Sequence, residues 1–529
     1  MQSWKSLSLV CLLFALGCDK NPAGAQLGGG AEPVASAEPD AGAQPGAGVE
    51  PDAGPQPGAE PAADVELGDR DSKTPPRATS EENTAAAVAS LWTRKAGEDW
   101  PIFLGPTRNN KSSETGILTD WSAGKLKILW QRELGTSYGI GTVSRGRYFQ
   151  FDRYDDKARL YCLQAETGKE LWRFEYPTQY RDLLGYNNGP RCSPILDGNR
   201  VYILGVEGML HCVQAADGEL VWQVDTSKEY GVVQNFFGVG STPAIEGDLL
   251  ICMIGGSPPG SPELYESGGR VKGNGSGIVA FDKYTGKVKY EMADELASYA
   301  SMQLATIGKR RWGFAFCRGG LIGFEPNSGN VDFHYPWRST LLESVNASTP
   351  VVVDDHVFIS ETYQVGSSLL RVAEGDYDVV WKDSRTIRAK AMLTHWNTPI
   401  HLNGYLYGCS GRNSPDADLR CINWKTGKVK WIEQEAEVRE RSSLLYVDGH
   451  FVYLGELGTM RLIKVNPQKY EPVSELILRR EGEEPDAIDG GKPRLLRYPC
   501  WAAPVLSHGL LYVRGEDRLV CLDLIPPKS

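Results

Sequence analysis

Between about Trp92 and Ser529, apolar runs of roughly four to eight residues alternate with turns rich in Gly, Asp and Pro. In the clearest example, YCLQAETGKELW (161–172), an apolar run leads through Thr167-Gly168 into a second run that carries Trp172. A tight hairpin needs a residue that adopts positive φ, and Gly does so at little steric cost. The pattern therefore predicts β-hairpins.

This hairpin is repeated, with near-copies at CVQAADGELVW (212–222) and CINWKTGKVKW (421–431). Each turn precedes an aromatic residue at a constant spacing, in the pairs Thr167/Trp172, Asp217/Trp222, Thr285/Tyr290, Ser328/Phe333 and Thr426/Trp431. Trp381, in GDYDVVW, is a degenerate copy. A repeat of about 40–50 residues with four short strands is typical of a β-propeller blade.

The first strands of these units predict eight blades, and they start near Gly141, Cys192, Ser241, Met302, Ser348, Asn397, Ser442 and Ala502. The last unit has no room for a fourth strand, but an extra strand, LKILWQREL (126–134), precedes the first unit. If that strand completes the last blade, the ring has no unpaired edge. We predict an all-β, eight-bladed propeller of four-stranded blades, with docking tryptophans between blades at Trp130, Trp172, Trp222, Trp381 and Trp431.

The repeated pattern, Ala165 to Trp172 and its copies, resembles the tryptophan-docking motif of PQQ-like, or quinoprotein-type, eight-bladed propellers. The resemblance extends over roughly residues 100–525 and includes the BamB-like branch of the superfamily. It implies two different functions. One branch contains PQQ-dependent alcohol and sugar dehydrogenases, and the other contains scaffold proteins without a cofactor. Fold alone does not choose between them.

The N-terminus predicts export. An apolar stretch, Leu7 to Leu16, follows Lys5 and has the length of a signal-peptide core. It ends in Ala-Leu-Gly-Cys (15–18), which resembles a bacterial lipobox with Ala15 where Leu is usual. We predict a lipoprotein signal peptide at 1–17, lipidation of Cys18, and a periplasm-facing chain anchored to an envelope membrane. An ordinary secretory peptide cut near Gly17 is the alternative.

Residues 18–91 form a segment rich in Pro, Gly, Ala and acidic residues, which cannot bury enough apolar surface to fold. We predict that it is a disordered tether and that the propeller occupies 92–529.

The net charge of -11 and the pI near 5.4 argue against a nucleic-acid partner. Nine cysteines of the predicted propeller lie mostly in apolar strands without metal-ligand spacing, which predicts small buried side chains and no metal site.

In a propeller, the loops that lead into the innermost strands share one face with the loops between second and third strands, and this face is the expected ligand site. The first set of loops supplies Tyr186, Asn187, Asn188, Arg191, Cys192, Asn235, Asn346, His395, Trp396, Asn397, Arg441, Cys500 and Trp501. The second set supplies Glu207, Arg318, Glu361, Tyr363, Arg412, Asn413, Glu456 and Glu516.

The main candidates for ligand binding are Asn187, Arg191, Asn235, Glu207, Glu361, His395, Trp396, Asn397, Arg412, Arg441 and Trp501. The tryptophans can stack on a ring, and the arginines can bind carboxylates. Glu207 or Glu361 can act as a base or, with Asn397, ligate a hard cation. The competing interpretation is structural, because Trp and Arg at loop ends also pack neighbouring blades and Asn satisfies turn backbone.

We predict a monomeric, membrane-tethered propeller that binds an envelope protein or a small polar ligand, without a catalytic residue, cofactor or metal. The alternative is a dehydrogenase dependent on PQQ and Ca²⁺. The quinoprotein resemblance implies adjacent cysteines and, for electron transfer, a C-x-x-C-H haem motif, and the sequence has neither. A third hypothesis is a carbohydrate- or peptidoglycan-binding module. Long insertions at 255–276 and 481–497 predict a lid or partner-binding arm, or tolerated surface loops.

Overall fold

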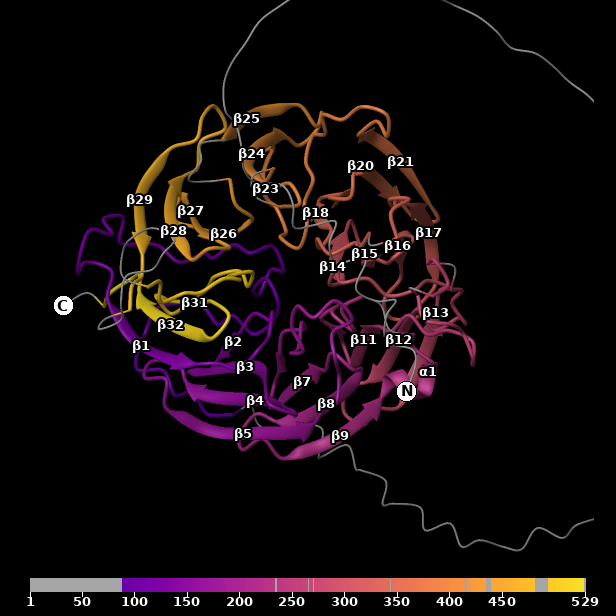
Figure 1. Ribbon diagram of the computed structural model, residues 1–529, viewed down its shortest axis with the longest axis horizontal. Coiled ribbons are helices and arrows are strands. Elements are labelled where there is room, and N and C mark those ends of the chain that lie inside the picture. Colours follow the sequence, from indigo (N-terminus) through magenta and orange to yellow (C-terminus); the bar gives the residue numbers. More distant parts are fainter. Residues whose placement is uncertain are drawn as a thin grey trace, which may run out of the picture. The chain divides into compact units, whose positions relative to one another are not determined.

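The computed structural model describes residues 88–233, 236–264, 266–269, 271–342, 344–413, 416–433, 439–480 and 493–527. Within them, eight four-stranded sheets follow one another in chain order around a ring (Figure 1). The predicted all-β, eight-bladed propeller is therefore confirmed. The signal peptide at 1–17, Cys18 and nearly all of the tether at 18–91 lie outside the described residues, as do Asn235 and most of the 481–497 insertion.

The blades are numbered in chain order. Blade 1 consists of β2 (Thr142–Ser144), β3 (Arg147–Tyr154), β4 (Lys157–Gln164) and β5 (Glu170–Pro177), and blade 2 of β6 (Ile195–Asp197), β7 (Arg200–Leu204), β8 (Met209–Gln214) and β9 (Leu220–Asp225). Blade 3 consists of β10 (Ala244–Glu246), β11 (Leu249–Met253), β12 (Ile278–Asp282) and β13 (Val288–Met292), and blade 4 of β14 (Gln303–Ile307), β15 (Arg310–Phe316), β16 (Gly320–Phe324) and β17 (Val331–Pro336).

Blades 5 to 8 continue the ring. Blade 5 consists of β18 (Val351–Val353), β19 (His356–Glu361), β20 (Gly366–Ala373) and β21 (Asp376–Lys382), and blade 6 of β22 (Ile400–Leu402), β23 (Tyr405–Ser410), β24 (Asp418–Asn423) and β25 (Val429–Glu433). Blade 7 consists of β26 (Ser442–Val447), β27 (His450–Gly455), β28 (Thr459–Lys464) and β29 (Pro472–Ile477), and blade 8 of β30 (Val505–Ser507), β31 (Leu510–Arg514), β32 (Arg518–Asp523) and β1 (Ile128–Glu133).

Blade 8 combines both parts of the chain. Its fourth strand is β1, which pairs antiparallel with β32 in a register that places Trp130 opposite Cys521. In the described part of the chain, the helix α1 (Thr226–Tyr230) is a single turn after β9, and no described helix is long and apolar enough to cross a bilayer.

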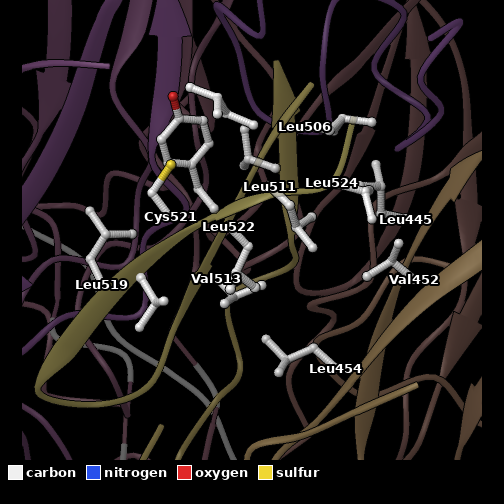
Figure 2. Packing of buried hydrophobic residues seen from close by; sticks show 14 of the residues in the cluster. Leu445, Val452, Leu454, Leu506, Leu511, Val513, Leu519, Cys521, Leu522 and Leu524 are labelled. Carbon is white, nitrogen blue, oxygen red and sulfur yellow. The ribbon is translucent and has the colours of Figure 1, made fainter. Parts of the chain in front are cut away.

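The hydrophobic core lies between neighbouring blades. Figure 2 shows it where blade 7 meets blade 8, with Val452 and Leu454 of β27 packing near Leu511 and Val513 of β31. The nine cysteines of the propeller are all buried and unpaired, as expected for small apolar side chains. Burial of such apolar surface is the main force that joins the blades.

The repeated Thr-Gly motif joins blades through its Trp. The indole of Trp172 in blade 1 donates a hydrogen bond from Nε1 to the carbonyl oxygen of Ala215 in blade 2, at 3.2 Å. Its ring lies 2.5 Å from the place that a Cβ on Gly218 would occupy. Gly218 therefore provides both the positive φ of the turn and the space for the ring.

The same contact recurs around the ring at all five tryptophans that the sequence predicts as docking residues. Their Nε1 atoms donate to the next blade in the pairs Trp130–Ala165, Trp172–Ala215, Trp222–Lys283, Trp381–Trp424 and Trp431–Asn466, at 2.8–3.2 Å. The motif therefore packs each blade against the next one.

Residues 92–125, which we call the strap, cross the ring before β1 begins. The backbone of Trp100 exchanges two 2.8 Å hydrogen bonds with Val143 of β2, and Ser112 N donates to the carbonyl oxygen of Tyr446 in β26. Leu118 N donates to the carbonyl oxygen of Leu524, just after β32. The strap thus ties blades 1, 7 and 8 together.

Candidate functional site

A cavity of about 320 Å³ lies at the centre of the ring, and we call it the central cavity. Its walls come from the loops that lead into the first strands of all eight blades. The strap supplies Phe103, Leu104 and Asn110 to the lining. Because the strap bonds to the first strands beyond the points where those loops enter, it forms the floor of the central cavity. The volume is at the lower end of typical small-molecule sites.

Aromatic side chains make up about a third of the residues that line the central cavity. The centroid of the Trp501 ring lies 4.8 Å from that of Tyr138 and 5.8 Å from that of Trp396. The aromatic lining residues are Phe103, Tyr138, Tyr186, Phe236, Phe237, Tyr299, Tyr363, Trp396, Tyr498 and Trp501. Such a wall favours flat or apolar groups, and the Tyr and Trp polar atoms orient them.

A buried ion pair positions one side of this wall. Arg441 donates from Nε and Nη2 to Oε2 of Glu456, at 2.9 and 2.6 Å, and the same oxygen accepts a 3.0 Å hydrogen bond from Trp501 Nε1. The Arg441 guanidinium also lies 4.7 Å from the Trp501 ring centroid. Glu456 therefore fixes both side chains and balances the charge of Arg441.

A second arginine of the lining, Arg191, is also paired. Its Nη2 lies 2.6 Å from Oδ2 of Asp182, and both side chains are nearly inaccessible to solvent. Arg412 differs, because it is exposed and its guanidinium stacks 4.5 Å from the Tyr363 ring centroid. Among the described residues, no carboxylate forms an ion pair with Arg412. Among the described residues that line the central cavity, Arg412 is therefore the arginine that lacks a carboxylate partner.

His395 is held in its neutral form. Burial, together with the charges of Arg441 and Arg412, lowers the pKa of His395 to about 3. Its Nδ1 lies 3.4 Å from Arg441 Nη1, and its Nε2 lies 3.5 Å from the Tyr363 hydroxyl. Since a guanidinium can only donate, Nδ1 is the acceptor and Nε2 carries the proton. His395 is a weak base at neutral pH because its acceptor nitrogen already faces a cation.

Three polar atoms of the lining are buried without a hydrogen-bond partner among the described residues, the acceptor Asn110 Oδ1 and two donors. Trp396 Nε1 and Arg191 Nε are buried without an acceptor in the described structure. Buried donors without a partner are costly, so a ligand that brings an acceptor gains free energy here. Together with Arg412, these donors favour a ligand that carries oxygen acceptors or negative charge.

The central cavity brings together seven of the eleven main candidates. Arg191, His395, Trp396, Asn397, Arg412, Arg441 and Trp501 line it. Asn397 mainly supports the local backbone, because its Oδ1 accepts from His395 N and its Nδ2 donates to Cys409 O.

Three other candidates lie elsewhere, and Asn235 is outside the described residues. Asn187 is buried and caps its own turn by accepting from Gly189 N. Glu361 is buried behind the wall, where it accepts from Ser344 Oγ and Tyr363 N. Glu207 lines a separate cavity. These acidic candidates therefore do not face the central cavity.

Sequence reasoning missed several parts of the wall. Tyr138, Phe236, Phe237, Tyr299 and Tyr498 line the central cavity without having been candidates. Each of these residues lies a few residues before the first strand of its blade. An aromatic residue at that place in the repeat was therefore the sequence signal that could have predicted them. Leu104 of the strap carried no such signal.

The residues of the central cavity do not fit PQQ held with Ca²⁺. The described lining contains no carboxylate, whereas Ca²⁺ needs a shell of oxygen ligands that usually includes carboxylates. No group of three His, Cys, Asp or Glu in the described residues has the arrangement of a metal site. Two of the three arginines are already neutralised by Asp182 and Glu456. The lining therefore offers no site for chemistry through this cofactor.

Comparison with known proteins places the chain in a family. The family model described as "Outer membrane protein assembly factor BamB" matches residues 115–258 and 185–433, together more than half of the chain. The chain belongs to this family. No curated protein sequence matches it significantly.

Three solved structures show what the chain is similar to. BamB from Moraxella catarrhalis is 13% identical, with a TM-score of 0.49 over 76% of this chain and 99% of that chain. Quinohemoprotein alcohol dehydrogenase from Comamonas testosteroni is 11% identical, with a TM-score of 0.54 over 82% of this chain and 81% of that chain. Quinohemoprotein alcohol dehydrogenase ADHIIG from Pseudomonas putida HK5 is also 11% identical, with a TM-score of 0.53 over 80% and 79%. The likeness to the two dehydrogenases, whose TM-scores exceed 0.5, supports the propeller fold alone.

Proposed function

We propose that this chain is a binding protein of the bacterial cell envelope that seats an acceptor-bearing group of a partner or small polar ligand in its central cavity. The observation that carries the proposal is the lining itself. It combines aromatic rings, buried donors that have no acceptor among the described residues, and the cation of Arg412, which forms no ion pair with a described carboxylate. Such a surface binds through stacking and hydrogen bonds to acceptors.

The same lining gives little support for catalysis. A general base works best when its pKa lies near the operating pH. Among the described lining residues, His395 is the one side chain of the His, Asp, Glu, Lys and Cys types, and its pKa of about 3 is far below that range. The proposal is therefore binding without conversion of the ligand.

The competing function is a PQQ- and Ca²⁺-dependent dehydrogenase. It is tested because the fold is similar to that of two quinohemoprotein alcohol dehydrogenases. The test adds PQQ and Ca²⁺ to the purified full chain and measures quinone absorbance and alcohol-dependent dye reduction. We expect neither. Dye reduction that needs both additions and is lost in Trp396→Ala would replace the binding proposal with an enzyme.

We further propose export and attachment to an envelope membrane through a lipid on Cys18. The support is the apolar stretch Leu7–Leu16 followed by Ala-Leu-Gly-Cys. Mass spectrometry of the N-terminal peptide from the membrane fraction is expected to find Cys18 as the first residue and acylated. Cys18→Ser should release the chain from that fraction. An unmodified N-terminus near residue 17 with the protein in the soluble fraction would indicate an ordinary secretory peptide.

A further inference from the structure

A cavity of about 260 Å³ lies where the 255–276 insertion meets blades 3 and 4, and we call it the arginine cavity. Its walls come from the insertion, the segment between β13 and β14, the β15–β16 loop and the segment after β17. It shares no described lining residue with the central cavity. The lining residues that matter for its chemistry are Gly269, Lys272, Asp294, Glu295, Arg318 and Arg338.

Two guanidinium groups of the arginine cavity converge at Gly269. Nη2 of Arg338 and Nη2 of Arg318 lie 3.7 and 3.9 Å from the place that a Cβ on Gly269 would occupy. A side chain at this position would contact both groups, and glycine, here with a φ of 83°, leaves that space open. The two nitrogens therefore lie close enough together to contact one small anion.

Arg318 is buried and held in place by backbone oxygens. Its Nη2 donates a 2.8 Å hydrogen bond to the carbonyl oxygen of Leu342, and its Nη1 donates one of 3.4 Å to that of Ser344. Burial, together with the charge of Arg338, lowers the pKa of Arg318 to about 10, so the side chain stays cationic at neutral pH. Two like charges so placed repel each other, and a bound anion relieves that repulsion.

Arg338 presents its charge to the arginine cavity. Its Nε is buried, whereas Nη1 and Nη2 keep accessible surface and donate no hydrogen bond to a described residue. No described carboxylate lies within ion-pair distance of Arg338. The lining carboxylate of Glu295 is engaged elsewhere, because its Oε1 lies 2.9 Å from His334 Nε2 and its Oε2 accepts a 2.9 Å hydrogen bond from Gly319 N. Accessible donors of Arg338 are therefore available to a ligand.

The charges of the lining favour an anion with a single negative charge. The described lining contains three cations, Lys272, Arg318 and Arg338, and two carboxylates, Asp294 and Glu295. One positive charge is therefore in excess among these residues. A carboxylate balances it, whereas the second charge of a phosphate dianion would be repelled by Asp294 and Glu295.

We propose that the arginine cavity binds a carboxylate group between Arg318 and Arg338. Arg338 donates to the carboxylate through its accessible Nη nitrogens, and Arg318 faces it from the other side of the space at Gly269. Hydrogen bonds between a guanidinium and a carboxylate are charge-assisted and strong. Val271 and Leu296 give the apolar stem of the ligand a contact surface. A free short-chain acid and the glutamate side chain of a partner share this chemistry.

The test measures binding to the full chain by calorimetry at low ionic strength, in a buffer without carboxylate or phosphate. The probes are n-butyrate, its neutral analogue butyramide, a capped peptide with one glutamate, and the same peptide with glutamine in its place. We expect both carboxylates to bind and both amides to fail. Arg338→Gln should weaken carboxylate binding at least about tenfold, because it removes the accessible charged donors.

Two further variants and a stability measurement serve as controls. Arg371→Gln removes the same charge from an exposed residue of blade 5 outside the arginine cavity, and should leave binding unchanged. Lys272→Gln removes an exposed charge of the lining and should weaken binding about threefold. Thermal unfolding of Arg338→Gln should change little, since Arg338 forms no ion pair with a described residue.

The outcomes separate the sources of the carboxylate and the two cavities. Binding of the glutamate peptide alone assigns the site to a partner, and binding of butyrate as well shows that a free acid suffices. Equal binding of the amides, unchanged binding in Arg338→Gln, or no binding of either carboxylate overturns the proposal, as does inorganic phosphate that binds more tightly than the carboxylates. Arg412→Ala should leave carboxylate binding here unchanged, so failure at the central cavity is distinguishable from failure at the arginine cavity.

Discussion

The guanidinium of Arg441 lies 2.6 Å from Oε2 of Glu456, and that same oxygen holds the indole of Trp501. Both members of the ion pair are almost completely buried, with side chains 10% and 4% exposed. One carboxylate therefore supports a cation and an aromatic ring of the central cavity. The geometry of the binding wall depends on a residue that does not itself line the central cavity.

Removal of Glu456 should destabilise the propeller strongly. Glu456→Ala leaves the buried Arg441 without a counter-ion, which typically costs about 3–5 kcal/mol. Urea denaturation of the purified protein measures the free energy of unfolding. Asp378→Ala is the control, since the Arg371–Asp378 pair is 58% and 67% exposed and its loss should cost about 1 kcal/mol or less. Similar losses in both variants would contradict a supporting role for Glu456.

Gly218 should tolerate a methyl group less well than Gly198. Both have positive φ, so alanine at either costs about 1–2 kcal/mol in backbone strain. At Gly198 a Cβ meets nothing within 4 Å, whereas at Gly218 it meets the Trp172 ring. Thermal unfolding should show an additional loss of about 1–3 kcal/mol for Gly218→Ala. That additional loss should disappear in the Trp172→Ala background, and its persistence would show that the ring is not the cause.

Stability should fall as pH rises from about 4.5 to 7, partly because of Glu361. Burial raises the pKa of Glu361 from 4.5 to about 7. Within that window the folded chain retains a proton that the unfolded chain has lost, so rising pH favours unfolding. The stabilisation of the folded chain by protonated Glu361 is complete below pH 4.5 and lost above pH 7, and it totals of order 3 kcal/mol.

Glu361→Gln should reduce this slope, because an amide does not titrate. Denaturation at pH 5 and pH 8 measures the effect in the variant and the unsubstituted chain. Burial also raises the pKa of Glu440 to about 7. Glu440 therefore titrates over the same pH range, and part of the pH dependence of the unfolding free energy should remain in Glu361→Gln. An unchanged difference between pH 5 and pH 8 would show that Glu361 is ionised in the folded chain.

Arg412→Ala should remove binding at the central cavity while leaving the fold intact. Arg412 is exposed and forms no ion pair among the described residues, so its loss should change the free energy of unfolding by about 0.5 kcal/mol or less. Arg191→Ala should be costly by comparison, because it leaves Asp182 buried without its partner. Thermal unfolding of both variants checks the contrast, and equal losses would contradict it.

The fold could be predicted because each blade repeats the same local requirement. A positive-φ Gly, a Trp and the spacing between them are visible in the sequence, and Trp172 against Gly218 shows why both are needed together. The strand at β1 could be placed because the last repeat lacked one, and β1 lies beside β32.

The candidate site was predicted in part. Arg412 and Trp396 could be assigned to the central face from their loops, but loop position does not decide whether a side chain points inward. Glu361 turns behind the wall because Ser344 and Tyr363 satisfy its oxygens. Leu104 reaches the cavity floor through long-range pairing of the strap, as in the hydrogen bonds of Trp100 with Val143. Local sequence does not encode that pairing.

The most direct measurement of the central claim is photo-cross-linking in living cells from a benzoylphenylalanine at position 186. Tyr186 lines the central cavity and is 61% exposed, and Tyr154 is a matched control outside it, at 59%. A binding function of the central cavity predicts a discrete cross-linked product from position 186 that Arg412→Ala removes and that position 154 does not give. The same product from both positions, or one from position 186 that survives Arg412→Ala, would contradict a binding function of the central cavity.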